Sequence, residues 1–74
     1  MVVIEIKESR VWYLDDCYQL GDLGSAQKHA DSTDALETLE HAGYSGLQNF
    51  RTLNERFAIV RPNGAKALCC IRTA

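Results

Sequence analysis

The side chains of this chain that could do chemistry are few: two histidines and three cysteines, namely His29, His41, Cys17, Cys69 and Cys70. Zinc sites usually take closely spaced cysteines, but the sequence contains no Cys-x-x-Cys pair. Cys69 and Cys70 are adjacent, and adjacent residues of a strand point to opposite faces, so these thiols cannot easily share a metal ion. We therefore expect no metal site, and we expect the cysteines to be reduced and to act as small hydrophobic side chains.

The sequence also lacks catalytic and cofactor motifs. Gly21 and Gly24 are not followed by the Lys-Ser/Thr pair and helix start of a phosphate-binding loop. His41 falls in the last turn of a predicted helix, where a cation complements the helix dipole. The pair Asp15-Asp16 is typical of a solvated acidic surface. We predict no enzymatic activity and no cofactor; a deep pocket that holds a histidine beside a cysteine would favour the enzymatic alternative.

Charge is divided unevenly along the chain. Residues 1–43 contain three basic and nine acidic residues, whereas residues 44–74 contain five basic residues and one acidic residue, which gives the net charge of −2. The basic residues of the second half are the candidate partner-binding residues: Arg51, Arg56, Arg61, Lys66 and Arg72. Arginines are enriched in protein interfaces and also bind phosphates. Because the sequence pI of about 5.5 is far below that of strongly basic nucleic-acid-binding domains, a protein partner is favoured and a nucleic acid is the alternative.

One stretch, residues 31–43, carries the signals of a complete helix. Ser32 is the expected N-cap, and Asp34 places negative charge at the positive end of the helix dipole. Gly43 can adopt the left-handed conformation that ends a helix. The apolar residues between these ends recur at helical spacing: Ala35, Leu36, Leu39 and Ala42. A helix of about three turns is not stable alone in water, so this apolar stripe must cover a sheet.

Strand patterns precede the helix. Residues 2–7 alternate between apolar and other side chains, and residues 11–14 are rich in residues that favour strands, so the two segments predict a hairpin. The signal is weaker from residue 15 to residue 31. Residues 17–20 could extend the sheet, residues 21–24 suggest a loop, and residues 25–30 fit either a polar edge strand or one helical turn.

The C-terminal part predicts a three-stranded meander. Asn63-Gly64 is a strong signal for a two-residue hairpin turn, because both central positions of that turn need a positive φ angle. Such a turn would pair Val60 with Ala67 and Ile59 with Leu68. A second two-residue turn at Asn54-Glu55 would pair Phe50 with Ile59.

These two turns predict which side chains of the meander face the helix. The set expected against the helical leucines is Phe50, Phe57, Ile59, Leu68 and Cys70. The set expected on the exterior is Asn49, Arg51, Arg56, Ala58, Val60, Ala67, Cys69 and Ile71. The exterior would then be a flat surface that bears arginines and could meet another molecule.

The chain is 74 residues long, the size of one small domain, and 46% of its residues are hydrophobic. We predict a single α+β domain over residues 1–74: an antiparallel sheet of four or five strands with one helix on one face, in the order β-β-α-β-β-β. No apolar run approaches the length of a membrane span, and Met1–Glu5 reaches a charged residue too early for a signal peptide. A cytoplasmic location and no membrane partner are therefore expected.

The layout of the chain resembles that of small anti-CRISPR proteins of phages and other mobile elements. The features are the N-terminal strand region, a capped helix that starts at a serine and ends in Ala42-Gly43-Tyr44, and the meander of residues 47–73. Short inhibitors of type I-F surveillance complexes are similar in this respect. The resemblance implies a non-catalytic inhibitor that docks on a larger bacterial protein or ribonucleoprotein complex. Together, these features predict a small protein–protein interaction module, with a nucleic-acid-binding module as the alternative and a homodimer as an open possibility.

Overall fold

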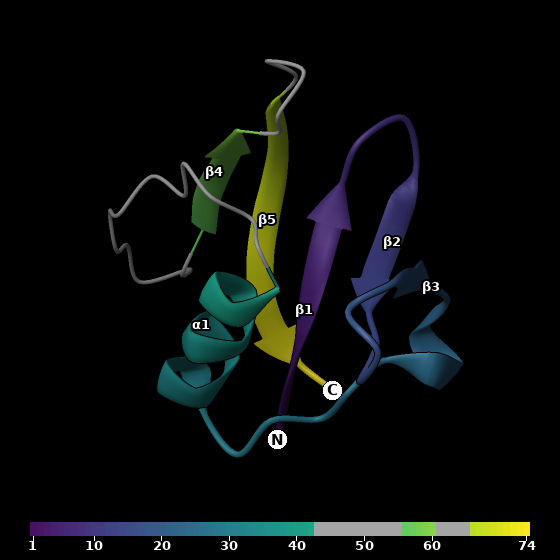
Figure 1. Cartoon of the computed structure of the whole chain (residues 1–74). Helices are drawn as coiled ribbons and strands as arrows, with labels where there is room; N and C mark the ends of the chain where they lie inside the picture. Colours follow the sequence, from purple (N-terminus) through teal and green to yellow (C-terminus); the bar gives the residue numbers. More distant parts are fainter. Residues whose placement is uncertain (43–55, 61–65) are drawn as a thin grey trace.

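The computed structural model describes residues 1–42, 56–60 and 66–74, and for residues 56–60 and Lys66 it describes the backbone alone. The chain forms one five-stranded sheet in the order β3-β2-β1-β5-β4, in which all neighbouring strands are antiparallel (Figure 1). The elements are β1 (Val2–Lys7), β2 (Val11–Leu14), β3 (Leu20–Gly21), a 3₁₀ turn η1 (Leu23–Ser25), α1 (Ser32–His41), β4 (Arg56–Val60) and β5 (Lys66–Thr73). The predicted α+β class, with an antiparallel sheet and a helix on one face, is confirmed.

Strand β1 lies at the centre of the sheet. It pairs with β2 on one side and with β5 on the other, although β5 is at the opposite end of the sequence. The register places Ile4 opposite Ile71 and Ile6 opposite Cys69. Because directly opposite residues of an antiparallel pair share a face, these four side chains form one apolar patch across two strands.

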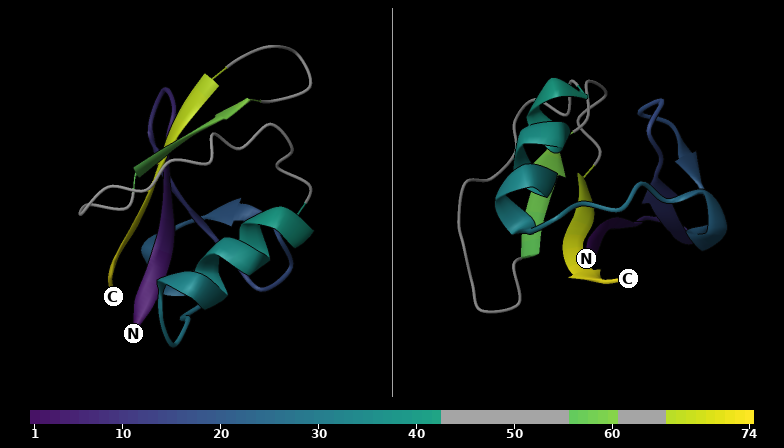
Figure 2. Two further views of the ribbon diagram at one scale, coloured as in Figure 1. Left: turned by 90° about the vertical axis from the view of Figure 1, so that its left-hand side faces the viewer. Right: turned by 90° about the horizontal axis from the view of Figure 1, so that it is seen from below.

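Helix α1 covers this apolar patch from one side of the sheet (Figure 2). Ala35 and Leu39 lie on the same helix face and are fully buried. The core cluster combines helix and sheet side chains: Ile4, Ile6, Leu14, Ala35, Leu39, Ala67, Cys69 and Ile71. The predicted stripe of apolar helix residues therefore faces the sheet, with Leu36 and Ala42 packed at the margin of the cluster.

The N-cap of α1 is Asp31, so the prediction of Ser32 at this position is wrong. Asp31 has an extended backbone, and its carboxylate Oδ1 accepts the backbone N–H of Asp34 at 2.9 Å. Ser32 is instead the first helical residue. Aspartate and serine have similar N-cap preferences, so the residue types alone did not distinguish two neighbouring candidates. Ala42 is the C-cap, and the predicted end at Gly43 lies outside the described residues.

The sequence left the structure of the segment between β2 and α1 open, and this segment contains a short strand, a 3₁₀ turn and an isolated β-bridge. Leu20 and Gly21 add the edge strand β3, and Leu23–Ser25 form a 3₁₀ turn capped by Asp22. His29 then pairs with Val2 through two backbone hydrogen bonds of 2.8 and 2.9 Å. β3 is therefore a third strand before the helix, whereas the predicted order of elements places two strands there.

The pairing of β4 with β5 differs from the prediction by one residue. Val60 lies opposite Lys66 and Ile59 opposite Ala67, whereas the predicted register pairs Val60 with Ala67 and Ile59 with Leu68. A shift of one residue moves every side chain of a strand to the other face. Ala67, Cys69 and Ile71 accordingly lie in the core, whereas Leu68 is 37% exposed.

The predicted faces of β5 are therefore wrong: the core residues were assigned to the exterior, and Leu68 and Cys70 to the helix side. The remaining parts of the predicted meander lie outside the described residues; they include the bend at Asn63-Gly64, the turn at Asn54-Glu55 and a strand around Phe50. Within the described part of the chain, α1 is too short and too polar to cross a bilayer.

Candidate functional site

The face of the sheet opposite α1 carries the most distinctive group of side chains. We call it the outer face and define it by alternation along β1, β2 and β5 from the core residues: Val3, Glu5, Lys7, Val11, Tyr13, Leu68, Cys70 and Arg72. The register places Glu5 opposite both Tyr13 of β2 and Cys70 of β5. Residues from both ends of the chain therefore meet around one carboxylate.

Glu5 is the centre of this group. Its side chain is only 4% exposed, and its carboxylate Oε2 accepts hydrogen bonds from Arg72 Nη1 at 2.6 Å and from Tyr13 Oη at 2.9 Å. The other oxygen, Oε1, lies 3.7 Å from Lys7 Nζ. A buried carboxylate is costly unless it is paired and hydrogen-bonded, and all three neighbours provide that compensation. We call these four residues, Glu5, Lys7, Tyr13 and Arg72, the Glu5 cluster.

The cluster shifts the pKa values of its members. Burial raises the pKa of Glu5, but the hydrogen bonds from Arg72 and Tyr13 and the charges of Arg72 and Lys7 outweigh burial and hold that pKa below its ordinary value. The hydrogen bond to the Glu5 carboxylate raises the pKa of Tyr13 and also raises the pKa of Arg72. Glu5 is therefore ionised, and both of its hydrogen-bond donors stay protonated, at neutral pH.

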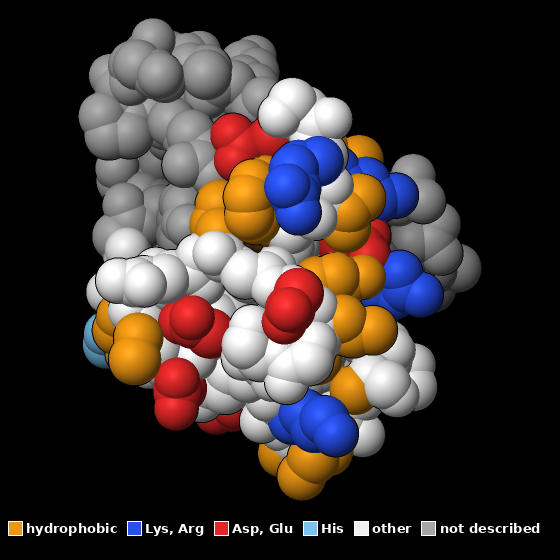
Figure 3. All heavy atoms as spheres, turned by 90° about the vertical axis from the view of Figure 1, so that its right-hand side faces the viewer, with side chains coloured by type: hydrophobic (Ala, Val, Ile, Leu, Met, Phe, Trp, Pro, Cys, Tyr) orange, Lys and Arg blue, Asp and Glu red, His pale blue; other side chains and the backbone are white. Residues whose placement is uncertain are grey.

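The outer rim of the cluster is open to solvent. The side chain of Arg72 is 57% exposed and that of Lys7 is 45% exposed. Lys7 stands in one cross-strand row between Val11 and Leu68, which are 46% and 37% exposed. Basic and hydrophobic side chains adjoin along the right-hand side of Figure 3, the side away from α1, whereas most of the visible carboxylates lie in the left half. The outer face thus combines apolar contact area with positive charge.

The structure describes one of the five predicted partner-binding side chains in full. Arg72 lies on the outer face and contacts Glu5. Arg51 and Arg61 lie outside the described residues. Arg56 and Lys66 are described by their backbone alone, at the first positions of β4 and β5; Arg56 stands opposite Cys70 in the register.

Sequence reasoning did not select Glu5, Lys7 or Tyr13 for this surface. One signal was present: Glu5 is a lone acidic residue within the apolar run Val2-Val3-Ile4-Glu5-Ile6. A charged residue at an interior position of a central strand needs a partner, but the partner, Arg72, is 67 positions away in the sequence. Only the pairing of β1 with β5 identifies it.

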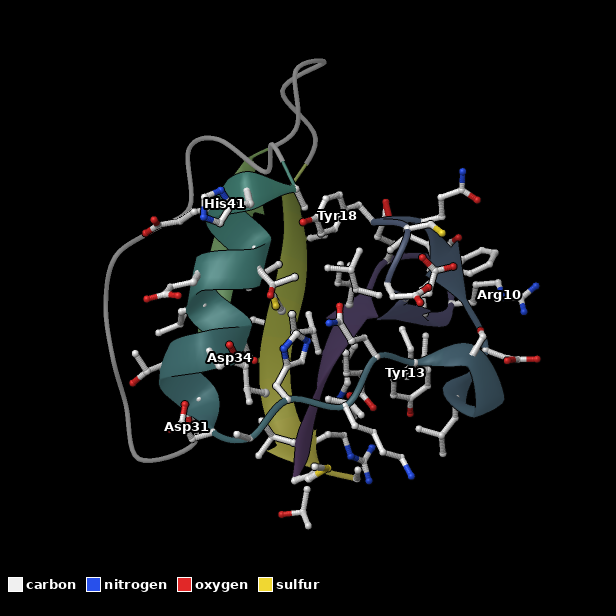
Figure 4. All side chains as sticks on the ribbon, turned by 60° about the horizontal axis from the view of Figure 1, so that its bottom comes forward. Arg10, Tyr13, Tyr18, Asp31, Asp34 and His41 are labelled. Carbon is white, nitrogen blue, oxygen red and sulfur yellow. The ribbon has the colours of Figure 1, made fainter. Side chains whose placement is uncertain are left out.

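His29 forms a second buried polar contact, on the helix side of the molecule. Its ring is 1% exposed, and Nδ1 lies 2.8 Å from Asp34 Oδ2 in the first turn of α1. Its Nε2 meets no hydrogen-bond partner within the described part of the chain. Figure 4 shows Asp31 and Asp34 together at the start of the helix and His41 at its other end. The His29–Asp34 contact joins the segment before α1 to the helix start.

The cysteines occupy three different environments. Cys69 is in the core, and burial raises the pKa of its thiol to about 12. Cys70 is also buried but belongs to the outer face, so the two neighbours do lie on opposite faces. Cys17 is exposed, and the charge of Asp16 raises the pKa of its thiol.

The residues Asp15, Asp16 and Cys17 bring their potential metal-ligating atoms within 4.8 Å of one another in an exposed turn. The Asp15 carboxylate already accepts the backbone N–H groups of Cys17 and Gln19, at 2.8 and 2.9 Å. Tyr18, with φ of 61°, completes this tight turn. The carboxylate therefore has a structural role in shaping the turn.

No protein family, curated protein or solved structure was found to match this chain.

Proposed function

We propose that this protein is a small, non-catalytic protein–protein interaction module that binds a larger protein or ribonucleoprotein through its outer face. The observation that carries the proposal is the composition of that face: exposed Val11 and Leu68 flank Lys7, next to the exposed guanidinium of Arg72. Interfaces combine apolar contact area with arginine and aromatic anchors in this way. The inhibitor role, of the anti-CRISPR kind, is the more specific form of this proposal and rests on the resemblance in layout.

Two features support binding rather than catalysis. The Glu5 carboxylate is engaged by Arg72, Tyr13 and Lys7, so it is not available as a general base. The His29 ring is buried, and its hydrogen bond goes to Asp34 instead of a thiol or hydroxyl nucleophile. Neither titratable group therefore meets a substrate from solution.

The test is affinity capture from a bacterial lysate with three tagged proteins. Leu68→Gln removes an exposed apolar side chain from the outer face, and Leu23→Gln removes one of similar size and 56% exposure from the 3₁₀ turn η1. A specific partner should bind the wild type and Leu23→Gln but bind Leu68→Gln more weakly, and nuclease treatment should not release it. Circular dichroism verifies that both variants are folded.

Two results would refute the proposal. If Leu68→Gln and Leu23→Gln retain the partner equally, the outer face is not the binding surface. If the captured material is nucleic acid and the affinity falls steeply with salt, the nucleic-acid-binding alternative is correct.

A further inference from the structure

The charges of the Glu5 cluster do not balance. Lys7 and Arg72 both approach the two oxygens of one carboxylate, at 3.7 and 2.6 Å, and Tyr13 contributes a neutral hydroxyl. The cluster therefore holds two positive charges and one negative charge. A like-charged pair around one carboxylate is stable mainly because solvent reaches both cations.

The surplus positive charge faces outward. Glu5 is 4% exposed, whereas the two cations that cover it are 45% and 57% exposed. Most carboxylates of the described residues lie elsewhere: on the turn at Asp15-Asp16, at Asp22 and along α1. Glu8 follows Lys7 at the end of β1, where its backbone bonds that of Arg10 in the turn to β2. The molecule thus presents a local positive site although its net charge is −2.

The geometry also indicates which kind of anion fits. The Glu5 hydrogen bond uses Nη1 of Arg72, and a guanidinium has five N–H donors, so other donors can reach an incoming group. Lys7 lies between exposed Val11 and Leu68, which gives apolar contacts on both sides of the charge. The phosphate groups of a nucleic acid offer charge but no apolar side chains, whereas a polypeptide offers a carboxylate and apolar side chains together.

We propose that the Glu5 cluster is a docking site for a carboxylate of a polypeptide partner: an aspartate or glutamate side chain flanked by apolar residues. The incoming carboxylate bonds Arg72 and Lys7 and brings the cluster to two positive and two negative charges. The flanking residues cover Val11 and Leu68. Glu5 holds the Arg72 guanidinium in place before the partner arrives, which lowers the ordering cost of binding. This inference rests on the proposed function and specifies the chemistry of the partner.

The test uses isotope-labelled full-length protein and short synthetic peptides, with amide chemical shifts measured by NMR. The acidic probe is a blocked peptide with a Leu-Glu-Leu centre between Gly-Ser segments, and the matched probe has Gln in place of Glu. The acidic peptide should shift the amides of Lys7, Leu68 and Arg72 and bind at least about tenfold more tightly than its Gln counterpart, because it adds charge-assisted hydrogen bonds.

Two matched variants locate the effect. Arg72→Gln should remove most of the preference for Glu over Gln, whereas Arg10→Gln, which makes the same change of charge at the arginine stacked on Trp12, should retain it. Lys7→Gln is the second cluster variant, because Lys7 is half exposed and its loss should leave the fold intact; it should reduce the preference severalfold.

The outcomes separate this inference from the proposed function. Equal binding of the two peptides on the outer face overturns carboxylate docking but leaves a protein-binding face. Shifts at the outer face with a short oligo-dT, and none with the acidic peptide, overturn both. Binding of neither probe overturns the carboxylate site, and the capture experiment with Leu68→Gln then decides the proposed function separately.

Discussion

The Glu5–Arg72 pair predicts an asymmetric response to mutation. Glu5→Gln removes the buried negative charge and leaves Arg72 in contact with water, since its side chain is 57% exposed. Arg72→Gln does the opposite, because it leaves a carboxylate that is 4% exposed without its closest partner. Both substitutions delete the same 2.6 Å ion pair, so a model that counts only contacts expects equal costs.

The expected magnitudes follow from the group that remains. Glu5→Gln should cost about 1 kcal/mol, since a neutral hydrogen bond replaces a charged one and no charge is left buried. Arg72→Gln should cost clearly more than Glu5→Gln, because the buried Glu5 carboxylate loses its closest partner, although Tyr13 and Lys7 still compensate it in part. The double variant should be more stable than Arg72→Gln alone, since it no longer contains the uncompensated carboxylate.

The pH dependence gives an independent check with a defined sign. The pKa of Glu5 in the folded wild type is below its ordinary value of 4.5, so its stabilising contribution is present above that value and is lost as the pH falls through the lowered pKa. In Arg72→Gln the pKa of Glu5 rises relative to wild type, because burial remains while the guanidinium is gone. The penalty of Arg72→Gln should therefore be largest near pH 7 and shrink towards pH 3.

The assay is urea denaturation of the wild type, both single variants and the double variant at pH 7 and pH 3, with slopes compared to verify two-state unfolding. The reasoning is refuted if Glu5→Gln is as destabilising as Arg72→Gln at pH 7. It is also refuted if acidification leaves the Arg72→Gln penalty unchanged.

Three further predictions concern other parts of the fold. Tyr13→Phe should lower the free energy of unfolding by about 1 kcal/mol at pH 7, because it removes the hydrogen bond to Glu5. Since the folded-state pKa of Tyr13 is raised above 10, the difference from wild type should disappear as the pH rises through that pKa. Urea denaturation at alkaline pH measures this difference. A thiol reagent should modify Cys17 in the folded protein, although slowly because the pKa of its thiol is raised. The same reagent should reach fully buried Cys69 only on unfolding. Equal labelling rates of Cys17 and Cys69 in the folded protein would contradict the burial pattern. Leu39→Ala should lower the free energy of unfolding by about 2–5 kcal/mol, whereas Leu68→Ala should lower it by less than about 1 kcal/mol. If urea denaturation shows the larger loss for Leu68→Ala, Leu68 faces the core, as the register predicted from sequence requires.

Local signals in the sequence were sufficient for the elements whose formation depends on neighbouring residues. The acidic start and the apolar stripe predicted α1 correctly, apart from the choice between Asp31 and Ser32 as N-cap. Alternation predicted β1, with Ile4 and Ile6 on one face and Glu5 on the other. In both cases the period of the pattern is set by backbone geometry within the element.

The face of β5 could not be read from its own residues. The run Ala67-Leu68-Cys69-Cys70-Ile71 is apolar at every position, so a period of two selects neither face. The structure selects one face because β5 pairs with β1, where Ile4 meets Ile71 and Ile6 meets Cys69. The Asn63-Gly64 signal pointed to a register in which Val60 lies opposite Ala67, whereas β4 pairs with β5 through Val60 and Lys66.

The sequence by itself determined the class of the fold, the helix and the apolar face of the first strand, because these follow from local backbone preferences and the period of the pattern. Only the tertiary structure decided that Glu5 is buried, that Arg72 and Tyr13 are its partners, and that the Glu5 cluster holds two positive charges and one negative charge. The physical reason is that the ionisation and the cost of a buried carboxylate depend on groups brought to it by the folding of distant segments, and the pattern of neighbouring residues does not contain that information.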